Sequence, residues 1–155
     1  MKEAKRVAPG ASRPHRIRVL FVCVGNACRS PMAEAISRYD AADVIEPSSA
    51  GLYPLGYIAE LTKQTLRKNG YSANGLTSDA LRKEAVEAAD LIINMTGRAS
   101  EEIFRGRKNV EDWLVQDPFG GDQETYQRVF EGIQRRVNQL ALGLREQRQD
   151  RKAPR

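Results

Sequence analysis

The chain has 155 residues, of which 41% are hydrophobic and 29% charged, enough for one globular domain with a buried core. No apolar run approaches the ~20 residues of a membrane-spanning helix, and the basic N-terminus lacks the apolar stretch of a secretory signal peptide. Two cysteines, Cys23 and Cys28, are too few for a disulfide scaffold, so we expect a cytoplasmic protein.

The net charge of +5 is concentrated at the two ends of the chain. Residues 1–18 carry six Lys and Arg against one Glu, and residues 145–155 carry five against two acids. The intervening residues, 19–144, carry 14 basic and 17 acidic side chains. A mildly acidic body argues against a nucleic-acid-binding face, and we expect neither nucleic acid nor a membrane as a partner.

The two basic ends lack apolar periodicity, whereas the rest of the chain contains no linker and no repeat. We therefore expect a disordered basic leader over 1–16, a single domain over 17–145 and a disordered basic tail over 146–155.

The domain begins with the best-marked pair of elements in the chain. Residues 17–24, IRVLFVCV, form a short apolar, β-branched run that is typical of a buried strand and ends before Gly25. Ser30 as the N-cap and Pro31 at the first helical position then predict a helix over 30–42.

Strand and helix patterns continue to alternate along the chain. In order, they predict a strand over 43–51, a helix over 58–70, a helix over 78–90 capped by Ser78 or Asp79, a strand over 90–96, a short helix over 99–106, a strand over 109–115, a turn-rich loop over 116–122 and a closing helix over 124–144. This alternation predicts an α/β sandwich built on a parallel sheet. Ligands bind such sheets beyond the C-terminal strand ends, where the first strand places Cys23.

Eight residues, CVGNACRS, link the first strand to the first helix and carry the chemistry. The free N–H groups of a helix start attract an anion, and a loop containing Gly25 and Asn26 can adopt positive φ and turn its amides inward. Arg29 adds a guanidinium suited to bidentate phosphate binding. This field favours a thiolate at Cys23, to which Ser30 can donate a hydrogen bond. The stretch predicts a cysteine nucleophile aimed at the phosphorus of a bound phosphate ester.

Each of these residues also has an ordinary structural explanation, such as a small buried Cys or a Gly-Asn turn, and only their combination favours function. The loop matches neither the P-loop NTPase motif nor the dinucleotide-binding glycine pattern. His15 is the only histidine and lies in the leader. The expected domain therefore contains no histidine that could pair with a cysteine or bind a metal ion.

Expulsion of an alkoxide or phenoxide by a thiolate requires a proton donor. In the loop VQDPFGGD, Asp117 precedes Pro118, which biases it toward an extended backbone, and is the best candidate acid, with Asp122 second. Phe119 could cover a substrate ring. In GLYPLGY, Tyr53 and Leu55 could flank such a ring.

The segment VCVGNACRSPMAEA resembles the active-site signature of the low-molecular-weight protein-tyrosine phosphatase family, and SSAG, ADLIINMT and DPFGG resemble further segments of it. The resemblance runs from about Arg18 to Leu144. It implies a three-layer α/β sandwich with a four-stranded parallel sheet, a phosphocysteine intermediate, a phosphorylated protein substrate, and no metal or other cofactor. It also implies that Cys23 is the nucleophile, that Arg29 binds phosphate and stabilises the transition state, and that Asp117 acts as general acid and then as general base.

The resemblance further implies a set of substrate- and phosphate-binding residues: Val24, Gly25, Asn26, Ala27, Cys28, Ser30, Tyr53 and Phe119. Among these, Asn26 is expected to shape the loop and Ser30 to assist the thiolate. Cys28 resembles the family residue that can pair with the nucleophile on oxidation, which would protect Cys23 from irreversible oxidation.

The chain departs from the family pattern at two places. Family members often have a histidine before the third helix that supports the loop, whereas this segment reads NGLTSDAL, so support must come from elsewhere, with Ser49 as a candidate. Ala27 stands where tyrosine-directed members often have a larger apolar residue and the protein-arginine-phosphatase branch has Thr. The DPFGG loop, followed by a helix containing Tyr126, looks more like the arginine branch.

These features favour a phosphatase acting on protein phosphotyrosine, with a protein-arginine phosphatase as the alternative. An arsenate reductase is less favoured because its chemistry normally needs further cysteines and none follows Cys28. A non-catalytic phosphate-binding module would be expected to lack Cys23 or Asp117, and both are present. The sequence leaves the oligomeric state open.

Overall fold

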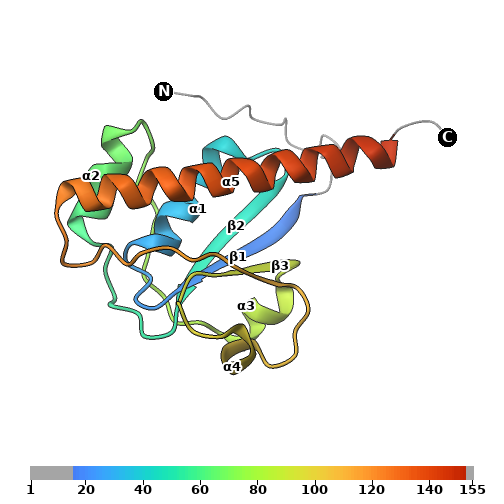
Figure 1. Cartoon of the computed structure of the whole chain (residues 1–155), viewed down its shortest axis with the longest axis horizontal. Coiled ribbons are helices and arrows are strands. Elements are labelled where there is room, and N and C mark those ends of the chain that lie inside the picture. The colour runs from blue at the N-terminus through green and yellow to red at the C-terminus, as the bar shows by residue number, and fades with distance from the viewer. Residues whose placement is uncertain (1–15, 153–155) are drawn as a thin grey trace.

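The structure, a computed structural model, describes residues 16–152 and contains the predicted parallel sheet (Figure 1). Four strands lie in the order β2-β1-β3-β4, and every neighbouring pair is parallel. They are β1 (Ile17–Cys23), β2 (Ile45–Gly51), β3 (Leu91–Asn94) and β4 (Val110–Asp112). The carboxyl ends of all four strands therefore meet at one edge of the sheet.

Helices cover both faces of this sheet, which confirms the predicted three layers (Figure 1). One face carries α1 (Arg29–Asp40), α2 (Glu60–Lys68) and the long α5 (Gln123–Lys152), and the other carries α3 (Lys83–Ala88) and α4 (Ser100–Phe104). Although α5 has 30 residues, neither it nor any other helix in the described part of the chain is apolar enough over a sufficient length to cross a bilayer.

The alternation of side chains along β1 supplies both hydrophobic cores. Phe21 and Cys23 pack into the core beneath α1 and α5, whereas Leu20 and Val22 pack into the core beneath α3 and α4. All four are buried, and each large apolar side chain removed from water contributes roughly 1.5–3 kcal/mol. The strand is therefore fixed on both faces, and Cys23 emerges at its carboxyl end on the α1 side.

The predicted helix over 78–90 is wrong in its first half, because α3 begins only at Lys83 and neither Ser78 nor Asp79 caps it. The backbone of this segment instead pairs with the end of β2. Gly51 donates its N–H to Asp79 O at 2.9 Å, and Leu81 donates its N–H to Gly51 O at 2.9 Å. These bonds hold the chain extended, which excludes a helix there.

The predicted N-cap of the first helix is also wrong. The cap position is Cys28, and Ser30 lies inside α1 with its hydroxyl facing the β1–α1 loop. The predicted helix over 30–42 therefore begins and ends slightly earlier, at Arg29 and Asp40.

The predicted disordered tail is wrong over 146–152, where α5 continues to Lys152. Arg145, the last residue of the predicted domain, and Arg148, in the predicted tail, both bind the turn between α1 and β2. Arg145 donates to both carboxylate oxygens of Asp43 at 2.8 and 2.9 Å, and Arg148 donates to Asp43 O at 2.6 Å. Residues that look like a solvated tail in the sequence therefore anchor the helix. The predicted leader, apart from Arg16, and residues 153–155 lie outside the described residues.

The Asp43–Arg145 pair gives a pH-dependent prediction. Hydrogen bonds from Arg145 lower the pKa of the Asp43 carboxyl, so the stabilisation it provides is present above the pKa of the unfolded chain and is lost as the pH falls through the lower folded-state pKa. Because both side chains are partly exposed, we expect Asp43→Asn to lower the free energy of unfolding by no more than about 1 kcal/mol at about pH 7, and by less at about pH 3.

Urea unfolding at the two pH values measures this difference. Glu87→Gln, whose carboxylate lies 3.9 Å from Lys83 Nζ on an exposed helix, is the control and should change little at either pH. An equal loss of stability for Asp43→Asn at both pH values would mean that the charge pair is not its cause.

Candidate active site

The loop joining β1 to α1 turns its carbonyl oxygens away from its centre. Four of them accept hydrogen bonds from the segment 52–59: Cys23 O from Leu52 N at 3.2 Å, Val24 O from Tyr53 N at 2.8 Å, Gly25 O from Leu55 N at 3.0 Å and Ala27 O from Ala59 N at 3.1 Å. Within residues 16–152, no acceptor is found for the backbone N–H groups of residues 25–29. These donors are left for an anion at the start of α1.

A pocket of about 240 Å³ lies over this loop. Its lining includes nine of the eleven predicted site residues, together with Leu55: Cys23, Val24, Gly25, Ala27, Cys28, Arg29, Tyr53, Asp117 and Phe119. The loop after β1, the segment around Tyr53 and the segment around Asp117 are far apart in the sequence and meet at this pocket. In the described part of the chain, no group of three or more His, Cys, Asp and Glu side chains is arranged to hold a metal ion.

Asn26 and Ser30, the other two predicted residues, have fully buried side chains behind the loop and not in the pocket. Asn26 has a φ of 47°, a left-handed conformation that Asn tolerates better than most residues. Its amide donates to Ser30 Oγ at 2.7 Å and to Ser49 Oγ at 3.0 Å, and its Oδ1 accepts from Asp79 N at 2.8 Å. These contacts hold the loop in shape, which is the role expected of Asn26, but neither side chain lines the pocket with the other predicted phosphate-binding residues.

The hydroxyl of Ser30 links this support to Cys23. The oxygen of Ser30 lies 2.9 Å from Cys23 Sγ and already accepts a hydrogen bond from Asn26. The hydroxyl hydrogen is therefore available to the sulfur, because the other acceptor, Ala50 O, is more distant at 3.5 Å. Such a bond stabilises a thiolate more than a neutral thiol.

Arg29 projects from the start of α1 into a buried position, with its side chain only 6% exposed. Its Nη1 donates to Met95 O at 2.6 Å and to Val115 O at 3.2 Å, and its Nη2 lies 3.5 Å from Asp117 Oδ2. No acceptor among the described residues satisfies its Nε. A buried unpaired donor costs about 1–3 kcal/mol, and an anion in the pocket would relieve that cost.

The two candidate acids have different surroundings. Asp117 lines the pocket with a half-exposed carboxylate, and its Oδ1 accepts from Phe119 N at 3.1 Å. Asp122 lies outside the pocket and accepts from the backbone N–H and the hydroxyl of Thr125 at 2.9 and 2.7 Å, at the start of α5. These hydrogen bonds lower the pKa of Asp122, which disfavours the protonated form that a general acid needs. The geometry favours Asp117.

Cys28, like Cys23, is a free thiol that lines the pocket. Its sulfur lies 3.4 Å from the hydroxyl of Tyr126, and burial raises the pKa of the Cys28 thiol. Burial and the contact with Cys28 also raise the pKa of the Tyr126 hydroxyl. Cys28 is thus held as a thiol beside Tyr126, and a disulfide with Cys23 stays a prediction.

The support that the missing histidine would supply comes from a chain of polar side chains. Ser49, the predicted candidate, donates to Glu34 Oε1 at 2.6 Å, and Glu34 is ion-paired with Arg38. Arg38 in turn donates to Asn74 O at 3.1 Å. Glu34 and Arg38 are not among the residues predicted for this support, although their i, i+4 spacing in α1 is a signal that the sequence contains.

Two further supporting residues were also missed. Ser78 donates to Gly25 O at 3.1 Å, where a helix cap had been predicted. A Cβ added at Gly51 would lie 2.8 Å from Val24 O and 2.9 Å from Asn26 N, so only glycine lets β2 approach the loop this closely. The SSAG segment ends at this glycine, but its sequence does not reveal the contact.

The chain is similar in sequence and in fold to several known proteins. The model of the family described as low molecular weight phosphotyrosine protein phosphatase matches residues 18–150. A protein-arginine-phosphatase from Bacillus subtilis is 31% identical over 148 residues, covering 84% of this chain and 98% of its own. Arsenate reductase 1 from Staphylococcus epidermidis is 30% identical over 125 residues, covering 79% and 94%. The structure of an arginine phosphatase from Geobacillus stearothermophilus superimposes with a TM-score of 0.79 at 27% identity, covering 90% and 99%.

The close approach at Gly51 gives a prediction about anion binding. We expect Gly51→Ala to weaken the binding of inorganic phosphate by about tenfold or more, because the new methyl group would displace the loop backbone. Isothermal titration with phosphate measures the effect. Gly143→Ala, which adds the same methyl group where no atom lies within 4 Å, is the control and should bind phosphate normally. Unchanged affinity in Gly51→Ala would show that the loop tolerates displacement.

Proposed function

Because the chain belongs to the low molecular weight phosphotyrosine protein phosphatase family, we propose that it hydrolyses protein phosphotyrosine through a phosphocysteine intermediate at Cys23. The family supports cysteine phosphatase activity in general. The observation that carries the proposal is the meeting of Cys23, Arg29 and Asp117 in one pocket above a loop with free N–H groups.

The first step transfers the phosphoryl group to sulfur. The Cys23 thiolate, stabilised by the Ser30 hydroxyl, attacks phosphorus as the bond to the leaving oxygen breaks. Nε and Nη2 of Arg29 and the loop N–H groups bind the phosphoryl oxygens in the transition state. Asp117, protonated at this stage, gives its proton to the leaving oxygen.

The second step releases phosphate. Asp117, now a carboxylate, accepts a proton from a water molecule as that water attacks phosphorus, and the sulfur–phosphorus bond breaks to regenerate the thiolate. The carboxylate lies 3.5 Å from Arg29, near the oxygens that both steps act on. Atoms and charge balance without any further reactant.

The pocket walls support an aromatic leaving group. Tyr53, Leu55 and Phe119 line the pocket and are all exposed, so a flat ring could lie against them on its way to Cys23. Arg98 packs over the Tyr53 ring at 5.5 Å and steadies that wall. A phosphorylated tyrosine of a protein fits these surroundings.

Phosphoarginine is the second candidate substrate. It is favoured by the similarity to the Bacillus subtilis and Geobacillus stearothermophilus protein-arginine-phosphatases, at 31% and 32% identity. Arsenate reduction is less favoured, because Cys28 is the only other cysteine in the sequence and faces Tyr126. The cytoplasmic location stays a prediction.

The role of Asp117 predicts a dependence on the leaving group. We expect Asp117→Asn to slow a substrate with a poor alcohol leaving group by about a hundredfold or more and an activated aryl phosphate far less, because a good leaving group needs little protonation. Steady-state kinetics on the two esters measures this ratio. Asp122→Asn is the matched control, since Asn also caps helices well. Equal slowing of both esters by Asp117→Asn would exclude the general-acid role.

The substrate itself is tested with two peptides that differ only in carrying phosphotyrosine or phosphoarginine. We expect both to be hydrolysed, with a higher kcat/KM for phosphotyrosine. Ala27→Thr should shift the ratio toward phosphoarginine and Ala27→Ile toward phosphotyrosine, each by about tenfold, because Ala27 lines the pocket floor. Inhibition by inorganic phosphate checks that each variant keeps its loop. A ratio unmoved by both variants would place specificity elsewhere in the pocket.

A further inference from the structure

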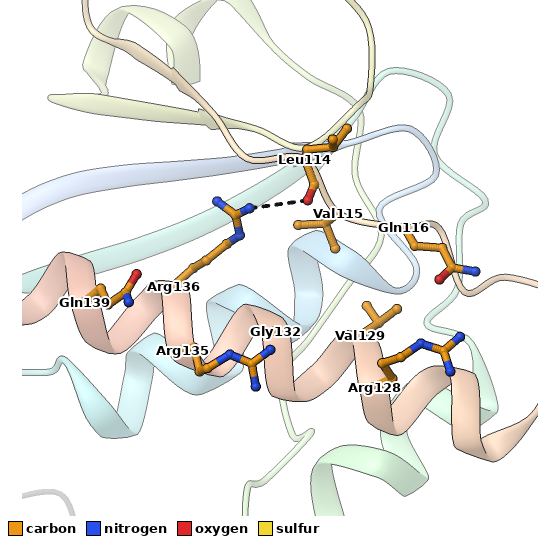
Figure 2. A pocket seen from close by; sticks show the side chains of 9 residues that line it. All are labelled: Leu114, Val115, Gln116, Arg128, Val129, Gly132, Arg135, Arg136 and Gln139. Atoms are coloured by element: carbon orange, nitrogen blue, oxygen red, sulfur yellow. Dashed lines mark hydrogen bonds between the residues drawn. The ribbon is translucent and has the colours of Figure 1, made fainter.

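A second and larger pocket, of about 530 Å³, lies beside the candidate active site and is not used by the proposed chemistry (Figure 2). One wall is the segment 114–116, which follows β4, and the other is the face of α5 that carries Arg128, Arg135 and Arg136. We call this pocket the arginine groove. Figure 2 shows the Arg128 and Arg135 guanidinium groups along the helix side of the groove, while that of Arg136 reaches across to Leu114.

The arginine groove carries an excess of positive charge, although the Asp122 carboxylate, which lies outside the groove, interacts electrostatically with Arg128. Three arginines line it and no acidic residue does. Among residues 16–152, no carboxylate lies within ion-pair distance of Arg128, Arg135 or Arg136. Like charges gathered on one face repel each other, and an anion between them would relieve that repulsion. This cluster stands out because residues 19–144 carry more acidic than basic side chains.

One of the arginines is already positioned by the protein. Arg136 packs 5.8 Å from the centre of the Trp113 ring and donates to Leu114 O at 3.4 Å. Arg128 and Arg135 are exposed, and within residues 16–152 neither makes a comparable ring contact or side-chain hydrogen bond. The groove therefore combines a fixed cation with two that are free to pair with an incoming anion.

The arginine groove is continuous with the candidate active site through the chain itself. Val115 lines the groove, and its carbonyl accepts the hydrogen bond from Arg29 Nη1 at 3.2 Å. Gln116 lines the groove, while the next residue, Asp117, lines the smaller pocket. A chain bound over Cys23 would therefore leave the smaller pocket beside the groove.

The dimensions of the groove suit an extended peptide. Arg128 and Arg135 are seven residues apart in α5, which corresponds to about 10.5 Å along the helix axis. An extended segment covers that distance in about three residues. The amides of Gln116 and Gln139 and the 86% exposed Leu114 add polar and apolar contacts for such a chain.

We propose that the arginine groove binds an acidic segment of the protein substrate that flanks its phosphorylated residue. Asp or Glu side chains of that segment pair with Arg128 and Arg135 while the phosphoryl group occupies the pocket above Cys23. The proposal rests on the proposed function, because it assumes a protein substrate. A nucleic acid is disfavoured as the occupant by the acidic character of residues 19–144.

Kinetics on three peptides test the proposal. The peptides share one phosphorylated residue and carry three Glu before it, three Glu after it, or Gln at all six positions. We expect one Glu peptide to have a kcat/KM about three- to tenfold above that of the Gln peptide, mostly through KM, with the advantage shrinking at high salt. Arg128→Gln combined with Arg135→Gln should remove this advantage and leave turnover of a small aryl phosphate unchanged.

A matched double variant controls for net charge. Arg107→Gln with Lys108→Gln removes the same two charges from the exposed turn between α4 and β4, on the opposite face of the sheet, and should keep the preference for Glu. The proposal is overturned if wild type treats all three peptides alike, if the groove variant keeps the preference, or if both variants lose it equally. Slower turnover of the aryl phosphate in the groove variant also contradicts it.

A binding measurement separates failure of this proposal from failure of the proposed function. The side-chain Nε–H NMR signals of Arg128 and Arg135 are followed as the unphosphorylated Glu and Gln peptides are added. Shifts with the Glu peptide alone support the groove even if no phosphate ester is hydrolysed. The proposal of an acidic segment is overturned if the Glu peptide causes no shifts, or if inorganic phosphate at an equal concentration of negative charge causes equal shifts. Neither result bears on the proposed phosphatase activity.

Discussion

The buried amide of Asn26 is the contact on which the candidate active site depends. It joins three parts of the chain, because it donates to Ser30 in α1 and to Ser49 in β2 and accepts from the backbone of Asp79. With a φ of 47° at this residue, the loop reverses direction so that its carbonyls face outward and its N–H groups face the pocket. The same contact leaves the Ser30 hydroxyl free to donate to Cys23. Removal of this one side chain would take a hydrogen-bond partner from the buried Ser30, from the half-buried Ser49 and from the backbone N–H of Asp79.

The parts of the site that could be predicted from the sequence are those encoded by neighbouring residues. Cys23 and Arg29 occupy the ends of one short loop between a clear strand and a clear helix, and their combination with the residues between them and with Ser30 indicates an anion site with a nucleophile. Asp117 was identified by the turn residues around it and by the need for an acid. The parallel sheet could be predicted because short apolar runs, typical of buried strands, alternate with amphipathic runs, typical of helices.

The parts that could not be predicted depend on contacts between distant segments. The helix expected from residue 78 is replaced by extended chain because that backbone pairs with Gly51, and helical propensity carries no information on such pairing. The basic end of the sequence resembles a solvated tail until Asp43 is seen beside Arg145. Likewise, the position of Asn26 three residues after Cys23 does not tell whether its side chain faces the ligand or the protein interior. In each case a partner at least 23 residues away decides the outcome.

The central claim is that the buried network prepares Cys23 to carry a phosphoryl group during turnover. The most direct measurement is to quench the protein during steady-state hydrolysis of a phosphotyrosine peptide and to locate any covalently bound phosphoryl group by mass spectrometry of the digested chain. The account predicts a phosphoryl group on the sulfur of Cys23, at a higher level in Asp117→Asn if loss of the base slows the second step more than the first. Rapid hydrolysis that continues in Cys23→Ser, with no phosphorylated cysteine in the wild-type protein, would contradict it.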